Sequence, residues 1–252
     1  MKPIGIMGAM AVETAVLIAE MTQRQVVTHL GLQFHVGLLR GQAVVIVSGG
    51  IGTVNAGAAT AVLLTHFQPQ ALIFTGVAGG LGQALTGDVV IGSKAILYGY
   101  GELSQTAYQP KQTQNPIQAD AHNPLYFEAD PRLFALAQAA AKTAVLPPLA
   151  CYGTGYTPKF LTGTIATEDV YSIDSQRNEQ ILADYDCVAF EMEGAAAALI
   201  CHQQQIPCLL VRAISNPANE MGAAENVYRR CKAETARNAQ LLVLAIMAYG
   251  NL

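Results

Sequence analysis

Apolar residues occur along the chain in two alternating kinds of run. Short runs rich in Val and Ile predict strands at residues 4–7, 43–47, 71–75, 88–98, 163–167, 187–190 and 208–214. Longer, Ala-rich runs predict helices at 11–21, 54–67, 132–145, 194–204 and 223–249. Several strand runs are continuously apolar, as expected of strands covered on both faces. The alternation predicts one α/β domain over residues 1–252, with a central mixed, mainly parallel, twisted sheet flanked by helices.

One segment departs from this pattern. Residues 99–124 are rich in Gln, Asn, Pro and Tyr and show no sustained period. A loop of this length in a compact domain is often functional or lies at an interface. A plain surface excursion accounts for it equally well, and both interpretations stay open.

Composition and charge exclude several classes of protein. The 252 residues are 52% hydrophobic and 13% charged, so the chain can bury a large core. The net charge of −4 and the lack of a basic run argue against nucleic acid as a partner. No apolar run reaches the roughly 20 residues that a membrane-spanning helix needs, and the N-terminus does not resemble a secretory signal. We expect a cytoplasmic protein with no membrane partner.

Cysteine and histidine spacing predicts neither disulfides nor a metal. The five cysteines are widely spaced in a chain with ample core, so disulfides are not needed, and we expect Cys201 and Cys208 to be buried as small hydrophobic residues. The five histidines show no HxxxH or HxH spacing. No GxGxxG or Walker sequence is present, and we expect no cofactor.

Glycines follow three of the predicted strands, at Gly8 and in the segments 48–52 and 76–80. The carboxyl ends of parallel strands share one edge of a sheet, where ligands usually bind, because glycine lets backbone N–H groups approach closely. Each cluster taken alone is also consistent with a tight turn.

Three acidic residues stand in apolar surroundings. Glu191 and Glu193 lie between a strand and a helix, where a buried carboxylate needs partners. Two ligand hydroxyls, such as those of a ribose, would satisfy it, and so would a helix N-terminus. Glu13, in a predicted first helical turn, could have a raised pKa and activate water, or could serve helix electrostatics alone.

The last predicted strand carries two further candidates. Arg212 lies within an apolar run and needs an anionic partner, for which Glu13, Glu191 and Glu193 are available; a purely structural ion pair is the alternative. Pro217 holds Asn216 in an extended conformation, and an amide can both donate to and accept from a purine edge.

Together these motifs resemble the nucleoside phosphorylase superfamily, and within it the 5′-methylthioadenosine/S-adenosylhomocysteine nucleosidases. The motifs occur in the family's order and extend from the first strand towards the last helix: residues 4–10 with Glu13, then 48–52, 75–80, 190–195 and 211–216.

The resemblance implies a nucleoside phosphorylase-like fold, a purine nucleoside as substrate and a role for each motif. Glu13 would activate water, Glu193 beside Met192 would hold the ribose hydroxyls, and Tyr171 would stack on the purine. The remaining substrate-binding residues would be Met10, Ile51, Val77, Ala78, Gly79, Ser172, Glu191 and Ser215, and Arg212 would join Glu13 and Asn216 as a catalytic residue. The family also implies a homodimer, with an apolar lid from the partner around residues 100–108.

Two departures from the family pattern matter. Asn216 stands where these nucleosidases usually have an aspartate that protonates the purine, and Val77 stands where they have a serine. An amide cannot deliver a proton, and losing a general acid costs roughly 10²–10⁴-fold in rate. An engineered replacement, a natural relative with another base, and a binding protein without catalysis all remain open.

The sequence therefore predicts an enzyme that hydrolyses the N-glycosidic bond of a 5′-methylthioadenosine or S-adenosylhomocysteine type nucleoside, releasing adenine and the 5′-thioribose. Release of hypoxanthine is the alternative, because futalosine hydrolases also have Ser-Asn at this point and an amide can donate to O6 or N7 of a 6-oxopurine. A second alternative is a nucleoside-binding protein without catalytic activity. No arginine occurs in residues 1–13 or 41–93, which favours water over phosphate as nucleophile.

Overall fold

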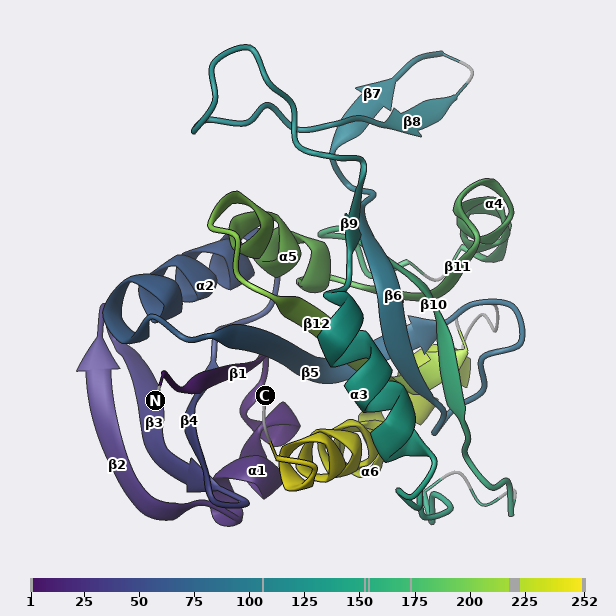
Figure 1. The fold of residues 1–252 in the computed structure, drawn as a ribbon. Helices are drawn as coiled ribbons and strands as arrows, with labels where there is room; N and C mark the ends of the chain where they lie inside the picture. Colours follow the sequence, from purple (N-terminus) through teal and green to yellow (C-terminus); the bar gives the residue numbers. More distant parts are fainter. Residues whose placement is uncertain are drawn as a thin grey trace.

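The computed structural model describes residues 2–105, 107–151, 153, 155–172, 174–217 and 223–250. Thr106, in the predicted irregular segment, lies outside the described residues. Helices cover both faces of a central mixed sheet (Figure 1). The predicted α/β fold class is confirmed.

The strands of this sheet lie side by side in an order that differs from their order in the chain. They are β11 (Cys187–Glu191), β10 (Phe160–Thr167), β6 (Val89–Leu97), β12 (Cys208–Pro217), β5 (Ala71–Gly80), β1 (Ile4–Gly8), β4 (Gln42–Ser48), β3 (Leu32–Leu39) and β2 (Thr22–His29), with β9 (Tyr126–Glu128) paired to β6. Parallel pairings join β4, β1, β5 and β12, and also β6, β10 and β11. Antiparallel pairings join β12 with β6 and β2 with β3 and β4, so the sheet is mixed, as predicted.

The sheet closes on itself near the end of β5. β11 pairs with β10 on one side and, in antiparallel register, with β5 on the other, where Phe190 lies opposite Gly79. Asn216 of β12 also lies opposite Gly79. The ends of three strands therefore meet at this glycine, which no single stretch of sequence reveals.

The helices form two layers. On one face, α6 (Ala223–Ala248) packs on β12 and β5 and contacts α1 (Ala15–Ala19) and α3 (Pro131–Ala141). On the other face lie α2 (Thr53–Phe67) and α5 (Gly194–Gln203), while α4 (Ser175–Tyr185) packs on β11 (Figure 1). A separate hydrophobic core fills each side of the sheet.

Part of the segment predicted to be irregular forms a two-stranded ribbon. β7 (Gly101–Leu103) pairs with β8 (Tyr108–Pro110), and the ribbon extends away from the sheet and helices (Figure 1). At its base, the Tyr108 hydroxyl donates a hydrogen bond to the Tyr98 carbonyl. Leu103 at the far end is 79% exposed.

The prediction of a single helix over residues 11–21 is wrong. A short 3₁₀ turn, η1 (Ala11–Glu13), is followed by α1, and β2 begins at Thr22. The Glu13 carboxylate accepts hydrogen bonds from the backbone N–H groups of Ala9 and Met10, so it stabilises the turn rather than a longer helix. The sequence analysis also missed β2, β3 and α4, of which β2 and α4 are rich in polar residues.

Cysteine pairing also differs from expectation. Cys151 and Cys231 form a disulfide, with their Cα atoms 5.3 Å apart. The backbone N–H of Cys151 donates to Glu234, and Arg230 donates to the Cys151 carbonyl, so α6 holds the two segments together across 80 residues of chain. Cys201 is buried as predicted, whereas Cys208 is half-buried.

Among the helices described, none has both the length and the hydropathy that crossing a membrane requires.

Candidate active site

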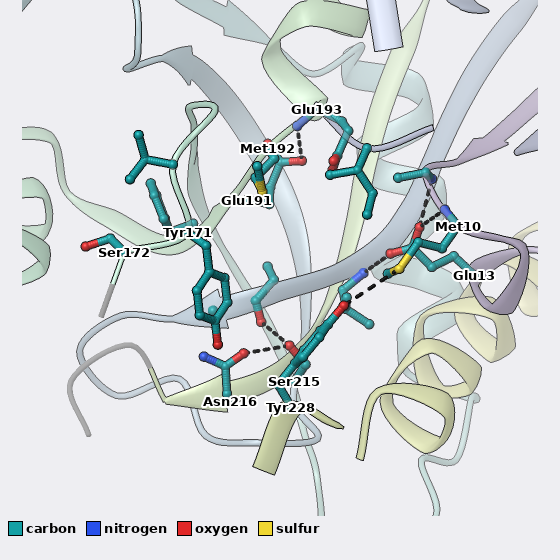
Figure 2. A pocket seen from close by; sticks show the side chains of 17 residues that line it. Met10, Glu13, Tyr171, Ser172, Glu191, Met192, Glu193, Ser215, Asn216 and Tyr228 are labelled. Carbon is teal, nitrogen blue, oxygen red and sulfur yellow. Dashed lines mark hydrogen bonds between the residues drawn. The ribbon is translucent and has the colours of Figure 1, made fainter. Parts of the chain in front are cut away.

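A pocket of about 220 Å³ opens where β1, β5, β11 and β12 end. Its wall contains every residue predicted to bind substrate, together with Glu13 and Asn216, but not Arg212. Figure 2 shows Tyr171, Ser172 and Asn216 towards one end and Met10 and Glu13 towards the other. Segments far apart in the chain thus contribute to one cavity.

Glu13 lies at the end of η1 and is 1% exposed. One carboxylate oxygen accepts hydrogen bonds from Ala9 N at 2.7 Å and Met10 N at 2.8 Å, and the other accepts from Val77 N at 2.8 Å. Burial raises the pKa of this carboxyl, while Arg212 and the three N–H groups oppose the rise. A carboxylate held rigidly with a raised pKa is suited to accept a proton from water.

Glu193 faces the pocket from the turn that precedes α5, and it lies above the cavity in Figure 2. Its Oε1 atom accepts a hydrogen bond from Gly52 N at 2.9 Å, and its Oε2 atom is 3.6 Å from Arg212 Nη2. Burial, together with the charge of Glu191, raises the pKa of Glu193 to about 8. These contacts leave lone pairs on both oxygens that ligand hydroxyls can use.

Glu191 has a different environment although it is two residues away. Its carboxylate accepts hydrogen bonds from the backbone N–H groups of Glu193 and Gly194, from the Thr167 hydroxyl and from Arg212. These groups include the first donors of α5, so Glu191 takes the helix N-terminus role that the sequence analysis left open. Glu191 borders the pocket, but protein groups already occupy its oxygens.

Arg212, predicted to be catalytic, lies beneath the pocket and is fully buried. Its Nη2 atom bonds Glu191 and approaches Glu193, and its guanidinium carbon lies 4.4 Å from the centre of the Phe74 ring. A side chain without exposed surface cannot contact a substrate directly. Arg212 therefore does not line the cavity with the other predicted catalytic residues; it meets Glu191 and Glu193, two of the acidic partners expected for it from the sequence.

Gly76 provides the space for this arrangement. A Cβ atom at Gly76 would lie 2.1 Å from Arg212 Nη1 and 2.6 Å from Glu13 Oε1. Any side chain here would therefore displace either the arginine or the carboxylate. The glycine of β5 is needed for close packing of charged groups rather than for a turn.

Asn216 and Ser215 line the pocket from a bulge in β12. The pairing of β12 with β5 shifts register between Ile214 and Asn216. The Ser215 hydroxyl lies 2.9 Å from Asn216 Oδ1 and 3.2 Å from the Ala78 carbonyl oxygen, and it can donate to either. The amide oxygen of Asn216 thus faces Ser215, and its nitrogen lies on the far side (Figure 2).

The segment after β10 forms the opposite wall. Tyr171 is 48% exposed, and its ring centre lies 6.2 Å from that of Tyr228. The neighbouring Asp169 accepts hydrogen bonds from the backbone N–H and the hydroxyl of Thr53, the first residue of α2. These bonds tie the Tyr171 segment to the glycine turn that contacts Glu193.

The sequence analysis missed four residues of the pocket wall: Ala9, Val170, Phe190 and Tyr228. The first three adjoin predicted residues, so adjacency could have revealed them. Tyr228 comes from α6, whose helical pattern contains no local sign of a site. Within the described ranges, no group of three or more His, Cys, Asp or Glu side chains is placed to hold a metal ion.

Comparison with known proteins identifies the family. The model of the phosphorylase superfamily matches residues 3–248. The chain belongs to the phosphorylase superfamily. The resemblance drawn from its motifs is therefore confirmed.

Two relatives within this superfamily are nucleosidases. The 5′-methylthioadenosine/S-adenosylhomocysteine nucleosidase of Shewanella loihica is 33% identical and aligns with 98% of this chain and 99% of its own length. The crystal structure of the Neisseria meningitidis 5′-methylthioadenosine/S-adenosylhomocysteine nucleosidase with methylthio-immucillin-A has a TM-score of 0.81 at 29% identity, covering 99% of this chain and 100% of that one. These matches confirm the prediction of an enzyme of the nucleosidase type.

A futalosine hydrolase of Helicobacter pylori has the same fold. Its TM-score is 0.79 at 24% identity, covering 97% of each chain.

The raised pKa of Glu193 predicts a pH-dependent stability. The folded protein retains a proton up to about pH 8, whereas the carboxyl has an ordinary pKa of 4.5 when unfolded. The contribution of Glu193 to the free energy of unfolding is therefore fully present below pH 4.5 and is lost as the pH rises towards 8. We expect the melting temperature of Glu193→Gln, minus that of the parent, to increase from about pH 5 to about pH 8 in ligand-free protein.

The matched control is Glu179→Gln, which changes an exposed glutamate on α4. A Glu193→Gln difference that stays constant or falls across this pH range would contradict the assignment.

Proposed function

We propose that this protein hydrolyses the N-glycosidic bond of a 5′-modified purine nucleoside of the 5′-methylthioadenosine and S-adenosylhomocysteine type, releasing adenine and the 5′-thioribose. The observation that carries the proposal is the convergence of Glu13 and Glu193 on one cavity. Both carboxyls have raised pKa values, and they come from segments far apart in the chain. The nucleosidases of S. loihica and N. meningitidis support the same chemistry.

In the proposed reaction, each carboxylate has a separate task. Glu193 accepts hydrogen bonds from the ribose hydroxyls and so fixes the sugar, while the ring of Tyr171 stacks on the purine. As the bond from C1′ to the base breaks, the sugar becomes an oxocarbenium-like cation, which the nearby negative charge stabilises. Glu13 takes a proton from a water molecule whose oxygen bonds to C1′.

The departing base leaves with the electrons of the broken bond and needs a proton. The Asn216 amide can donate a hydrogen bond to it but cannot transfer a proton. Solvent must therefore protonate the base, and we expect slower release of adenine than an aspartate at this position would give.

Water is a better nucleophile for this cavity than phosphate. Among the described residues, no arginine or lysine lines the pocket. The nearest guanidinium, that of Arg212, is already paired with carboxylates. A phosphate dianion would meet Glu13 and Glu193 without a compensating cation.

The β7–β8 ribbon supports a homodimer in this proposal. Leu103 and Tyr100 are exposed on a ribbon that extends away from the body of the chain (Figure 1). In a dimer, this ribbon would cover the partner's pocket as an apolar lid. A cytoplasmic location stays a prediction.

A second candidate is release of a 6-oxopurine such as hypoxanthine. The shorter of the two contacts of the Ser215 hydroxyl, that with Asn216 Oδ1, favours it. When Ser215 donates to Oδ1, the NH₂ group of Asn216 lies on the far side and can act as a donor. Such a donor matches the O6 and N7 acceptors of a 6-oxopurine.

Hydrolysis is tested by identifying both products. We expect purified protein incubated with 5′-methylthioadenosine in ¹⁸O-labelled water to release free adenine and to place ¹⁸O on C1′ of the sugar, as seen by mass spectrometry. Glu13→Gln should reduce the rate by roughly 10²–10⁴-fold, since it removes the base that activates water. The exposed Glu20→Gln serves as the control.

Cleavage that requires phosphate, or full activity of Glu13→Gln, would contradict this mechanism. Binding of nucleosides without any cleavage would instead indicate a nucleoside-binding protein.

The identity of the base is tested by Asn216→Asp. We expect this variant to cleave 5′-methylthioadenosine about 10²–10⁴-fold faster than the parent, because a carboxylic acid can protonate the leaving purine. Steady-state rates on this substrate and on 5′-methylthioinosine are compared, with Asn226→Asp on the exposed side of α6 as control. Faster cleavage of the inosine compound by the parent, lost in Asn216→Asp, would instead establish the 6-oxopurine candidate.

A further inference from the structure

Tyr228 contributes a phenol to the sugar end of the pocket from the first part of α6. Its hydroxyl lies 3.7 Å from the Met10 sulfur, which is the hydrogen bond that it makes within the described chain. In Figure 2 the Tyr228 ring runs beneath the cavity, and its hydroxyl points towards Met10 and Glu13. The fold thus brings a polar group to a place that the sequence motifs do not predict.

The present partner of this hydroxyl is weak. A thioether sulfur is a poor acceptor, so exchanging it for a ligand oxygen would strengthen the bond. Burial, and the charges of Glu13 and Glu193, raise the pKa of Tyr228, so the hydroxyl remains protonated and acts as a donor. The Met10 side chain beside this hydroxyl offers no N–H or O–H donor, and neither do Ile51 and Met192 elsewhere in the pocket wall.

The position of the hydroxyl relative to Glu193 indicates which part of a nucleoside it meets. Glu193 lies above the cavity and Tyr228 below it in Figure 2. A ribose held by its 2′- and 3′-hydroxyls at Glu193 turns its opposite edge, which carries O4′ and C5′, towards Tyr228. This placement of the ribose rests on the proposed function.

We propose that Tyr228 is a specificity-determining residue whose hydroxyl donates a hydrogen bond to the first atom of a polar 5′ substituent. The pocket then accepts nucleosides with a 5′-oxygen, of which the unmodified ribonucleoside is the simplest, as well as 5′-thio compounds. Without this hydroxyl, the oxygen of a 5′-hydroxyl would meet no side-chain donor beside Met10, and the substrate would lose a hydrogen bond from water without replacement.

The test compares two substrates that differ by one oxygen atom, adenosine and 5′-deoxyadenosine, or inosine and 5′-deoxyinosine if the base is a 6-oxopurine. The readout is the ratio of kcat/KM for the 5′-hydroxy compound to that for the 5′-deoxy compound. We expect Tyr228→Phe to lower this ratio by roughly three- to tenfold, the effect of one neutral hydrogen bond. Because it is a ratio, a general loss of activity in the variant does not affect it.

Tyr249→Phe is the matched control, since it removes a hydroxyl that follows the end of the same helix and bonds the Ala139 carbonyl at 3.1 Å. It should leave the ratio unchanged. A ratio for Tyr228→Phe within about twofold of the parent would overturn the proposal.

Binding measurements separate this proposal from the proposed function. Dissociation constants for the same pair are measured by calorimetry in Glu13→Gln protein with and without Tyr228→Phe. If the parent cleaves neither these compounds nor 5′-methylthioadenosine but the binding ratio falls on loss of the hydroxyl, hydrolysis is refuted and the role of Tyr228 stands. If both compounds are cleaved and neither ratio changes, the role of Tyr228 is refuted. Failure of the protein to bind either compound would refute both.

Discussion

The site depends on one buried guanidinium shared among acidic side chains. Arg212 pairs with Glu191 and approaches Glu193, and its charge also acts on Glu13. Burying these carboxylates without a cation would be very costly, yet a single cation cannot offset all of them. Burial therefore raises the pKa values of Glu13 and Glu193, and in the proposed reaction this suits Glu13 to accept a proton.

Backbone N–H groups supply hydrogen bonds to the carboxylates whose charges the arginine offsets only in part. Val77 donates to Glu13 from within β5, Gly52 donates to Glu193 from the turn after β4, and Gly76 leaves room for the arginine. The glycine clusters therefore position charged side chains within the protein as well as opening the sheet edge to a ligand. The proposed function uses carboxylates whose charges Arg212 compensates only in part. Hydrogen bonds from the surrounding backbone reduce the free-energy cost of burying them.

The alternation of apolar runs predicted the fold class, and the position of Glu13, Glu193 and Asn216 beside strand ends marked them as candidates. Most other residues of the pocket wall were expected only because the motifs resemble the nucleosidase family. The sequence could not separate Glu191 from Glu193, since only the start of α5 decides which carboxylate is occupied by N–H groups. The acidic partners that it indicated for Arg212 include those found in the structure, but it did not show that Arg212 lies outside the pocket wall, and it missed Tyr228, which reaches the pocket from the last helix. The surroundings of Glu191, Arg212 and Tyr228 depend on contacts between segments far apart in the chain, which residue spacing does not reveal.

A crystal structure with methylthio-immucillin-A would test the central claim most directly. The account predicts that the sugar ring lies between Glu13 and Glu193, with its hydroxyls within hydrogen-bond distance of Glu193 and the base beside Asn216. An inhibitor bound outside this cavity, or a sugar that contacts neither carboxylate, would contradict it.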